Sequence, residues 1–343
     1  MSGAAVRIDE DTLHLPGGVG VRFMRTLRLP ETGTHPLPPG LGTFPLRRVA
    51  DHADRVPEEM RRRGGVLLPV YLREAMWLRF LGTRPAAVQV GAGKVCAVSG
   101  EPWSGRLAGD PQNYVVVPRQ PWLDGVNSGA GTVRQFVAVP LGLGATVEGQ
   151  VTGEEVWGGV QLQSFPLGAA ALERWREEER RAVLRRTAAG PLAAPGALAA
   201  GAPPPAPSAP APRGAAMGLG AGGSMRQEVY RDPRPLSDWA PRPAGRVFVH
   251  LVTPPQWRHI TGEAPPPSPV DRAAYTAAGL PWYDYFDEDA DALSPTDALA
   301  AVRPVGDWLG EDHEPWQQPS PGQVTPLGDA TDAPGGAVQD GDW

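Results

Sequence analysis

Aromatic, acidic and amide side chains gather in residues 121–150, the part of the chain best suited to bind a ligand. Trp and Tyr supply contact area at interfaces and in ligand clefts, and polar side chains fix the orientation of the ligand. A second aromatic and acidic string, LPWYDYFDE, lies at 280–288. We therefore expect a ligand- or partner-binding surface formed by Trp122, Asp124, Arg134, Gln135, Glu148, Gln150, Trp282, Tyr283 and Asp284.

Three functions are open for these residues. The leading hypothesis is a non-enzymatic binding or interaction protein of unknown ligand. The second is a carboxylate-dependent hydrolase in which Asp124, Glu148 and Glu154 act as general acid and base while Arg134 stabilises an anion. The third is a structural or assembly protein, which would fit a β-rich composition. The sequence itself assigns no catalytic residue.

Two glycine-rich strings imitate nucleotide-binding motifs. The string at 218–223 matches G-x-G-x-x-G, which binds dinucleotides only between a strand and a helix. Here a low-complexity segment precedes it and Pro233 follows closely. In VGAGKVC, Val95 follows Lys94, where a phosphate-binding loop needs Ser or Thr. The sequence predicts a glycine-rich strand entry at 218–223 and a hairpin turn before Lys94, with no nucleotide cofactor.

Metal-ligating side chains do not occur at suitable spacings. Cys96 is the only cysteine, so neither an internal disulfide nor a Cys-rich metal site can form. His250 lies on the apolar face of RVFVHLV, where a hydrogen-bonded core histidine is the simpler interpretation. We expect no metal and no cofactor.

Charge is distributed unevenly along the chain. Residues 1–186 carry 23 basic and 19 acidic side chains, whereas residues 187–343 carry 9 and 19. A nucleic-acid-binding protein normally presents a strongly basic surface, so we expect no nucleic-acid partner. The chain has no apolar leader and no run of about 20 apolar residues. These features favour a cytoplasmic protein without a membrane span, and they are compatible with a homo-oligomer.

Hydrophobic spacing predicts a mainly β fold with a few short helices (α+β). Residues 21–30 alternate as in a half-buried strand. Short valine-rich runs between 86 and 166, GATVEGQVTG among them, are separated by turn residues and indicate a sandwich- or barrel-like unit. Helical spacing is found in VPEEMRRRGG, in VYLREAMWLRFLG (70–82) and in the charged segment 168–186.

Composition divides the chain into two β-rich units and three irregular segments. Residues 187–216 are almost entirely Ala, Pro and Gly and cannot bury enough apolar area to offset the entropy of ordering. Strand patterns return after them in SMRQEVY and RVFVHLVT, and helical patterns in PPQWRHITG, SPVDRAAYTAAG and PTDALAAVR. We predict a ragged N-terminus at 1–20, a β-rich domain at 21–186, a disordered linker at 187–216, a smaller β-rich domain at 217–309 and a disordered acidic tail at 310–343.

Two short motifs recur. Pro-Trp occurs four times, and GDW occurs at 306–308 and again at 341–343. The repeated GDW is either a short docking motif or a chance repeat.

Several long strings resemble a family of uncharacterised bacterial and fungal proteins. They are PWLDGVNSGAGTVRQFVAVPLGLGATVEGQVTG, GGVQLQ, GLGAGGSMRQEVYRDP and LPWYDYFDE, and the resemblance covers about residues 22–167 and 217–290. Some similar fungal chains carry a ubiquitin-like domain between the two blocks, where this chain has only the Ala/Pro linker. The resemblance implies no particular chemistry, but it implies that the two blocks belong together.

Overall fold

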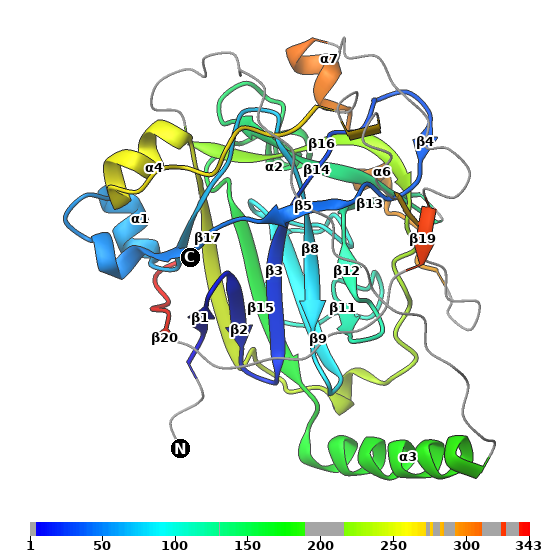
Figure 1. Ribbon diagram of the computed structural model, residues 1–343. Coiled ribbons are helices and arrows are strands. Elements are labelled where there is room, and N and C mark those ends of the chain that lie inside the picture. The colour runs from blue at the N-terminus through cyan, green and yellow to red at the C-terminus, as the bar shows by residue number, and fades with distance from the viewer. Residues whose placement is uncertain are drawn as a thin grey trace.

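The computed structural model describes residues 5–129, 131–188, 216–271, 275–276, 282–284, 292–310, 324–326 and 336–343. The predicted linker lies almost wholly outside these ranges, as do half of the predicted helix at 268–279 and much of the predicted tail. The described part is mainly β with a few helices, as predicted, and most of its strands belong to one large sheet (Figure 1).

The central strands form two antiparallel runs, β2–β3–β8–β14–β16 and β17–β15–β9, which meet at the single pair Met217↔Leu251. Shorter strands extend its edges, and only β18 and β19 form a separate pair in the described part. The strands are β1 (Arg7–Asp9), β2 (Thr12–Leu15), β3 (Val19–Thr26), β4 (Thr34–His35), β5 (Gly40–Thr43), β6 (Arg47–Arg48), β7 (Val66–Pro69), β8 (Ala75–Leu81), β9 (Ala86–Ala92), β10 (Val95–Cys96), β11 (Val115–Val117), β12 (Trp122–Leu123), β13 (Gly125–Gly129), β14 (Thr132–Pro140), β15 (Val160–Pro166), β16 (Met217–Arg226), β17 (Gly245–Val252), β18 (Trp282–Asp284), β19 (Val324–Pro326) and β20 (Gly336–Ala337).

The two β-rich units predicted from the sequence, whose packing on one another it left open, share this sheet. Strand β16, which follows the linker, pairs with β14 from Pro140↔Met217 to Thr132↔Arg226. Strand β17 lies between β15 and β7. The two sequence blocks therefore complete one another, and the division into two units does not extend to the tertiary structure.

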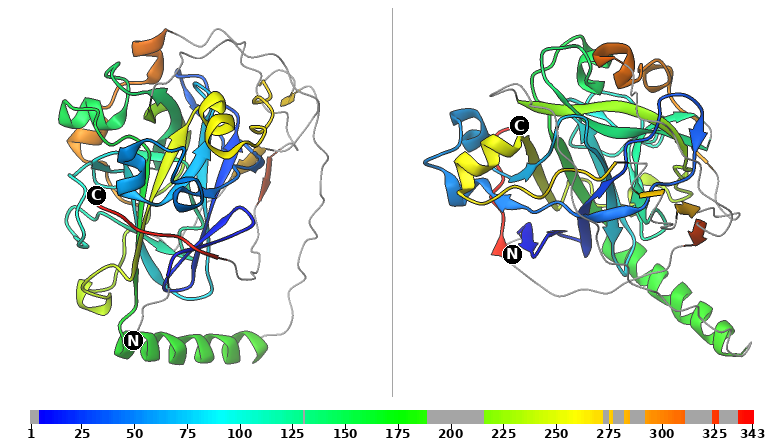
Figure 2. Two further views of the ribbon diagram at one scale, coloured as in Figure 1. Left: turned by 90° about the vertical axis from the view of Figure 1, so that its left-hand side faces the viewer. Right: turned by 45° about the horizontal axis from the view of Figure 1, so that its top comes forward.

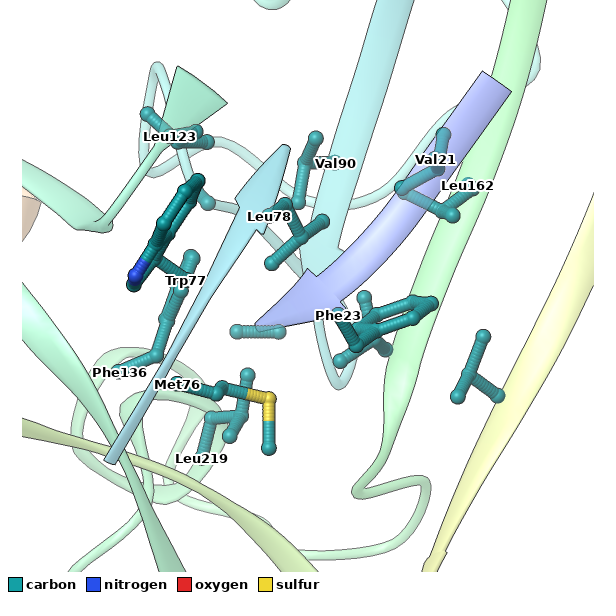
Figure 3. Packing of buried hydrophobic residues seen from close by; sticks show 14 of the residues in the cluster. Val21, Phe23, Met76, Trp77, Leu78, Val90, Leu123, Phe136, Leu162 and Leu219 are labelled. Carbon is teal, nitrogen blue, oxygen red and sulfur yellow. The ribbon is translucent and has the colours of Figure 1, made fainter. Parts of the chain in front are cut away.

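The sheet curls so that the inner faces of distant strands meet in one core. Figure 3 shows Phe23 of β3, Leu78 of β8, Val90 of β9 and Leu162 of β15 converging, and all four are fully buried. Leu219 of β16 belongs to the same cluster. Side chains from both sequence blocks thus fill a single interior.

The glycine-rich string at 218–223 forms part of strand β16, as predicted, and no helix follows it. Its glycines permit close packing rather than unusual dihedral angles. A Cβ on Gly223 would lie 2.0 Å from the Pro30 carbonyl oxygen, and one on Gly220 would lie 2.7 Å from Val305. The hairpin predicted before Lys94 is also present, because Val95 pairs with Ala92.

Two secondary-structure predictions are wrong. Residues 70–82, predicted as a helix, contain strand β8, which is buried on both faces between β3 and β14. A strand with two apolar faces loses the alternation that identifies strands, so its apolar spacing can imitate a helix. Conversely, the valine-rich run at 144–153 contains a helix, whose first turn is capped when Thr146 accepts a hydrogen bond from Gly149 N at 2.9 Å.

The predicted helices at 56–65, 168–186, 254–262 and 295–303 are present, the last as a single turn. Helix α3 projects from the sheet (Figures 1 and 2), and its first residues pack on the body of the protein, with Ala171 buried against Trp239. In the part of the chain that the structure describes, no helix is long and apolar enough to cross a membrane. The helices are η1 (Val49–His52), α1 (Glu58–Arg63), α2 (Val147–Thr152), α3 (Ala169–Ala188), η2 (Leu236–Asp238), α4 (Pro254–Thr261), α6 (Asp297–Ala300) and α7 (Val305–Leu309).

The final residues, 336–343, lie against the body of the protein. Strand β20 pairs with β1, and Figure 2 shows the red C-terminal segment beside the blue N-terminal strands. Val338 is buried in the main core, and Gly65 N donates a hydrogen bond to Gln339 O at 2.7 Å. The prediction of a disordered tail from 310 to 343 is therefore wrong for these eight residues.

Candidate functional site

Two of the predicted site residues bind backbone groups and have a structural role. Gln135 is fully buried, and its amide donates to Leu27 O at 2.8 Å and accepts from Leu29 N at 3.0 Å. Gln150 donates to Arg303 O at 3.1 Å and accepts from Arg303 N at 2.6 Å. Both amides replace the hydrogen bonds that a neighbouring strand would supply, so neither is available to a ligand.

Glu148 also binds backbone groups. Its buried carboxylate accepts hydrogen bonds from Trp157 N at 3.0 Å and from Gly158 N at 2.8 Å. Gly93 lies directly against it, because a Cβ there would come 2.4 Å from Glu148 Oε2. The carboxylate therefore fixes the loop that carries Trp157.

Asp124 is a buried carboxyl group beside Trp122. Its side chain is 0% exposed, and neither oxygen has a regular hydrogen-bond partner in the described structure. Burial raises the pKa of Asp124 well above its usual range, and the Trp122 side chain only partly opposes this effect. Burial therefore favours the protonated form of Asp124, because an unpaired charge at such depth is strongly disfavoured.

Among the remaining predicted residues, the structure describes the side chains of Trp122 and Arg134. Trp122 is buried and packs edge-on against Trp77 at 6.4 Å between ring centroids. Arg134 is half-buried on β14, opposite Val126 of β13. Residues 282–284 form strand β18, and their side chains lie outside the described structure. Asp124, Gln135 and Glu148 are at most 1% exposed, so these three predicted residues contribute to no exposed binding surface in the described structure.

A polar region lies instead on the outer face of strands β9, β15 and β17. Cross-strand pairing aligns Gln89, Gln163 and Arg246 in one row. The next row on this face consists of Gly91, Gln161 and Phe248. Apolar clusters cover the face on both sides, one around Tyr114 and Trp239 and the other around Trp257 and Ile260. The polar rows thus interrupt an otherwise apolar outer face.

Several buried polar atoms in these rows have no hydrogen-bond partner in the described structure. They are Oε1 of Gln89, Gln161 and Gln163 and the indole Nε1 of Trp103. The three glutamines are at most 3% exposed. An unpaired buried amide costs about 1–3 kcal/mol of folding free energy, so four such atoms in one area require an explanation.

A cleft of about 850 Å³ opens beside these glutamines. We call it the arginine cleft, because Arg106, Arg242 and Arg246 line it together with Gln163. In the described structure, neither Arg106 nor Arg242 forms an ion pair, whereas Arg246 Nε contacts Asp340 Oδ2 at 2.5 Å. The remaining lining residues are Ser104, Gly105, Pro241, Pro243, Ala244, Gly245 and Asp340.

Trp343 occupies an aromatic enclosure next to the cleft. We call this enclosure the tryptophan box and define it by Trp103, Trp157, Phe248 and Arg246. The Trp343 ring lies 6.1 Å from Trp103, 6.3 Å from Trp157 and 5.9 Å from Phe248, measured between centroids. The Arg246 guanidinium lies 4.8 Å from its centroid. Trp103 and Trp157 belong to loops, whereas Phe248 and Arg246 belong to β17. Because these segments are far apart in the sequence, the box depends on assembly of the sheet.

Neither site was predicted as a binding site from the sequence. The glutamines at 89, 161 and 163 could have been found, because polar residues in valine-rich strands mark a face that is not part of an apolar core. Trp103 belongs to one of the four Pro-Trp pairs, and Trp343 to the second GDW. The first GDW lies elsewhere, in α7, where Trp308 stacks on Arg303.

Comparison with protein-family models, with curated proteins and with solved structures finds no match to this chain. The functional argument therefore starts from the geometry of the arginine cleft and the tryptophan box.

Proposed function

We propose that the protein is a non-enzymatic binding protein that takes a polar, negatively charged ligand in the arginine cleft. The observation that carries this proposal is Gln163, a 3% exposed side chain that lines the cleft while its Oε1 atom has no partner in the described structure. Because this Oε1 atom is buried, a ligand with an O–H or N–H donor would satisfy it once the Gln163 amide turns towards the cleft. Binding sites commonly combine such a fixed polar group with a concave surface.

The charge of the cleft selects an anion. Arg106 and Arg242 carry no ion pair within the described residues, and guanidinium groups bind carboxylates and phosphates through paired hydrogen bonds. Both side chains are exposed, so their attraction for an anion weakens at high salt. The ligand class that fits is a small molecule or segment that carries both an anionic group and hydrogen-bond donors.

The hydrolase alternative has less support. Glu148 accepts two backbone hydrogen bonds, Asp124 is fully buried, and Glu154 pairs with Lys94 at 3.2 Å on the surface. No two of these three carboxyl groups contact each other in the described structure. A general acid and base must converge on one substrate, and these groups do not.

Thermal denaturation with a panel of small ligands tests the proposal. The panel contains hydroxycarboxylates, amino acids, sugar phosphates and uncharged sugars. An anionic class should raise the melting temperature of the wild-type chain, because a ligand that binds only the folded state stabilises it. The rise should disappear in the R242Q/Q163L variant and persist in R181Q, a matched loss of an exposed arginine on the distant helix α3. Absence of any rise, or one that survives R242Q/Q163L, would show the proposal to be wrong.

A further inference from the structure

The contacts of residues 340–343 resemble those of a bound peptide. Arg246 makes four of them: Nε to Asp340 Oδ2 at 2.5 Å, Nη2 to Gly341 O at 3.0 Å, Nη1 to the main-chain oxygen of Trp343 at 3.1 Å, and the stacking on the Trp343 ring. The indole Nε1 of Trp343 donates to Asp340 Oδ1 at 2.9 Å. An aspartate and a tryptophan three residues later thus bind one arginine together.

The backbone of this segment pairs with residues 62–65, at the end of helix α1. Gly65 N donates to Gln339 O at 2.7 Å, and Asp342 N donates to Arg62 O at 3.0 Å. Gly341 fits closely here, since a Cβ would lie 2.1 Å from Arg62 O. Main-chain pairing of this kind contributes affinity, while pockets for individual side chains contribute specificity.

The chemistry of the tryptophan box favours an aromatic side chain next to an anion. Three aromatic walls alone would also suit a cation, but Arg246 forms the remaining side and would repel a positively charged group. An indole stacks on a guanidinium and on aromatic rings at once. The carboxylate of an accompanying aspartate pairs with the same arginine.

The present occupant leaves part of the site unsatisfied. Trp103 Nε1 and Gln161 Oε1 remain without partners in the described structure although Trp343 is in place. Trp343 is only half-buried, and Asp342 is exposed. The arginine cleft also continues past Asp340 to Arg106 and Arg242. A longer acidic segment could fill the box and also reach those two arginines.

We infer that the tryptophan box is a docking site for a partner protein segment of the form Asp-x-x-Trp, and that residues 340–343 occupy it in its absence. This inference rests on the proposed function, because the segment would continue into the arginine cleft. The partner's tryptophan replaces Trp343, its aspartate pairs with Arg246, and further acidic residues contact Arg106 and Arg242.

A peptide in solution tests this inference. The probe is the fluorescein-labelled peptide VQDGDW, titrated into the full chain and followed by fluorescence anisotropy. The W343A chain, with an empty box, should bind it in the micromolar range, and the wild-type chain should bind at least about tenfold more weakly because its box is occupied. W308A, which removes the tryptophan of the other GDW, is the matched control and should behave as wild type. The peptide VQDGDA and the double variant W343A/R246Q should both lose binding.

Hydrogen exchange of the wild-type chain provides a second measurement that does not depend on the folding of W343A. An excess of VQDGDW should increase the exchange of the Asp342 amide, whose hydrogen bond to Arg62 is lost when the peptide displaces the segment. VQDGDA should leave that exchange unchanged.

The outcomes separate the two proposals. Equal peptide affinity for the wild-type and W343A chains, or no binding to W343A together with unchanged exchange in the wild type, would overturn the docking inference. If small anions nevertheless bind the cleft in a manner that depends on Arg242, the proposed function stands without it. If neither the peptide nor the anions bind, both proposals are wrong.

Discussion

The carboxylate of Glu148 holds the backbone of Trp157, accepting its N–H at 3.0 Å, and so fixes one wall of the tryptophan box from within helix α2. Arg63 supports the same wall, because its guanidinium lies 6.0 Å from the Trp157 ring centroid and donates to Trp157 O at 3.2 Å. Glu148, which was predicted as a ligand contact, therefore acts as a positioning residue for Trp157.

Replacing Glu148 by glutamine should disturb the box more than the fold. The amide can accept only through one oxygen, whereas the carboxylate accepts from both Trp157 N and Gly158 N. We expect a loss of about 1–3 kcal/mol of unfolding free energy and weaker quenching of Trp343 fluorescence by its aromatic neighbours. E154Q, an exposed neighbour, is the control for urea denaturation and fluorescence. A fully wild-type emission spectrum for E148Q would contradict the positioning role.

Replacing Gly91 by alanine should displace Trp103 from its position in the tryptophan box while the sheet stays intact. A Cβ there would lie 2.8 Å from both Trp103 Cε3 and Gln161 Oε1, so Trp103 must move away from strand β9. In the W343A background, G91A should weaken binding of VQDGDW by about tenfold or more. G109A is the matched control, because Gly109 lies outside the arginine cleft and a Cβ there meets only Leu236, at 3.8 Å. Similar affinities for the two variants would argue against Trp103 as a wall of the box.

Asp124 should make the protein less stable as the pH rises. Because burial raises its pKa in the folded state, the folded protein retains a proton that the unfolded chain releases above about pH 4. Unfolding free energy then falls as pH rises from there to the folded-state pKa. D124N removes this titration, so its stability relative to wild type should improve as the pH rises from 4 to 8. Urea denaturation at both pH values measures the difference, and a constant difference would contradict a protonated Asp124.

His250 should have the opposite effect and make the protein less stable as the pH falls. Burial lowers its pKa to about 4, and Arg63 adds to this, while the hydrogen bond to Gly64 O opposes it. The unfolded chain gains a proton near pH 6.5 but the folded protein does not, so stability decreases as pH falls from 6.5 towards 4. Across this pH range, protonation of His250 in the unfolded chain should lower the unfolding free energy by about 3 kcal/mol. H250Q should flatten this part of the stability profile, and an unchanged slope would show that other groups cause it.

A chain cut in the linker should remain one particle. Strands β14 and β16 pair along nearly their whole length across the linker, and the core cluster draws on both sides of it. A specific protease site introduced at residue 200 should, after cleavage, give two fragments that co-elute in size-exclusion chromatography and unfold in a single transition. Separation of the fragments under native conditions would contradict the shared sheet.

The sequence determined the local features of this protein. Alternation in residues 21–30 identified β3, the Thr-Pro-Pro start of residues 253–261 fits α4, and the Gly-rich string at 218–223 was assigned to a strand because no helix pattern follows it. These features depend on neighbours a few residues apart, so the pattern of the chain carries them.

Tertiary structure decided which residues could bind anything. Gln135 and Glu148 looked like ligand contacts, but strands and loops from distant parts of the chain supply the backbone groups that they bind. Gln163 looked ordinary, and only the alignment of β9, β15 and β17 places it on a face where its Oε1 atom is buried and unpaired in the described structure. Partner choice between strands is a long-range property, set by burial of both faces of a sheet. A single sequence records which residues are polar, but the fold decides which of them are left without a partner.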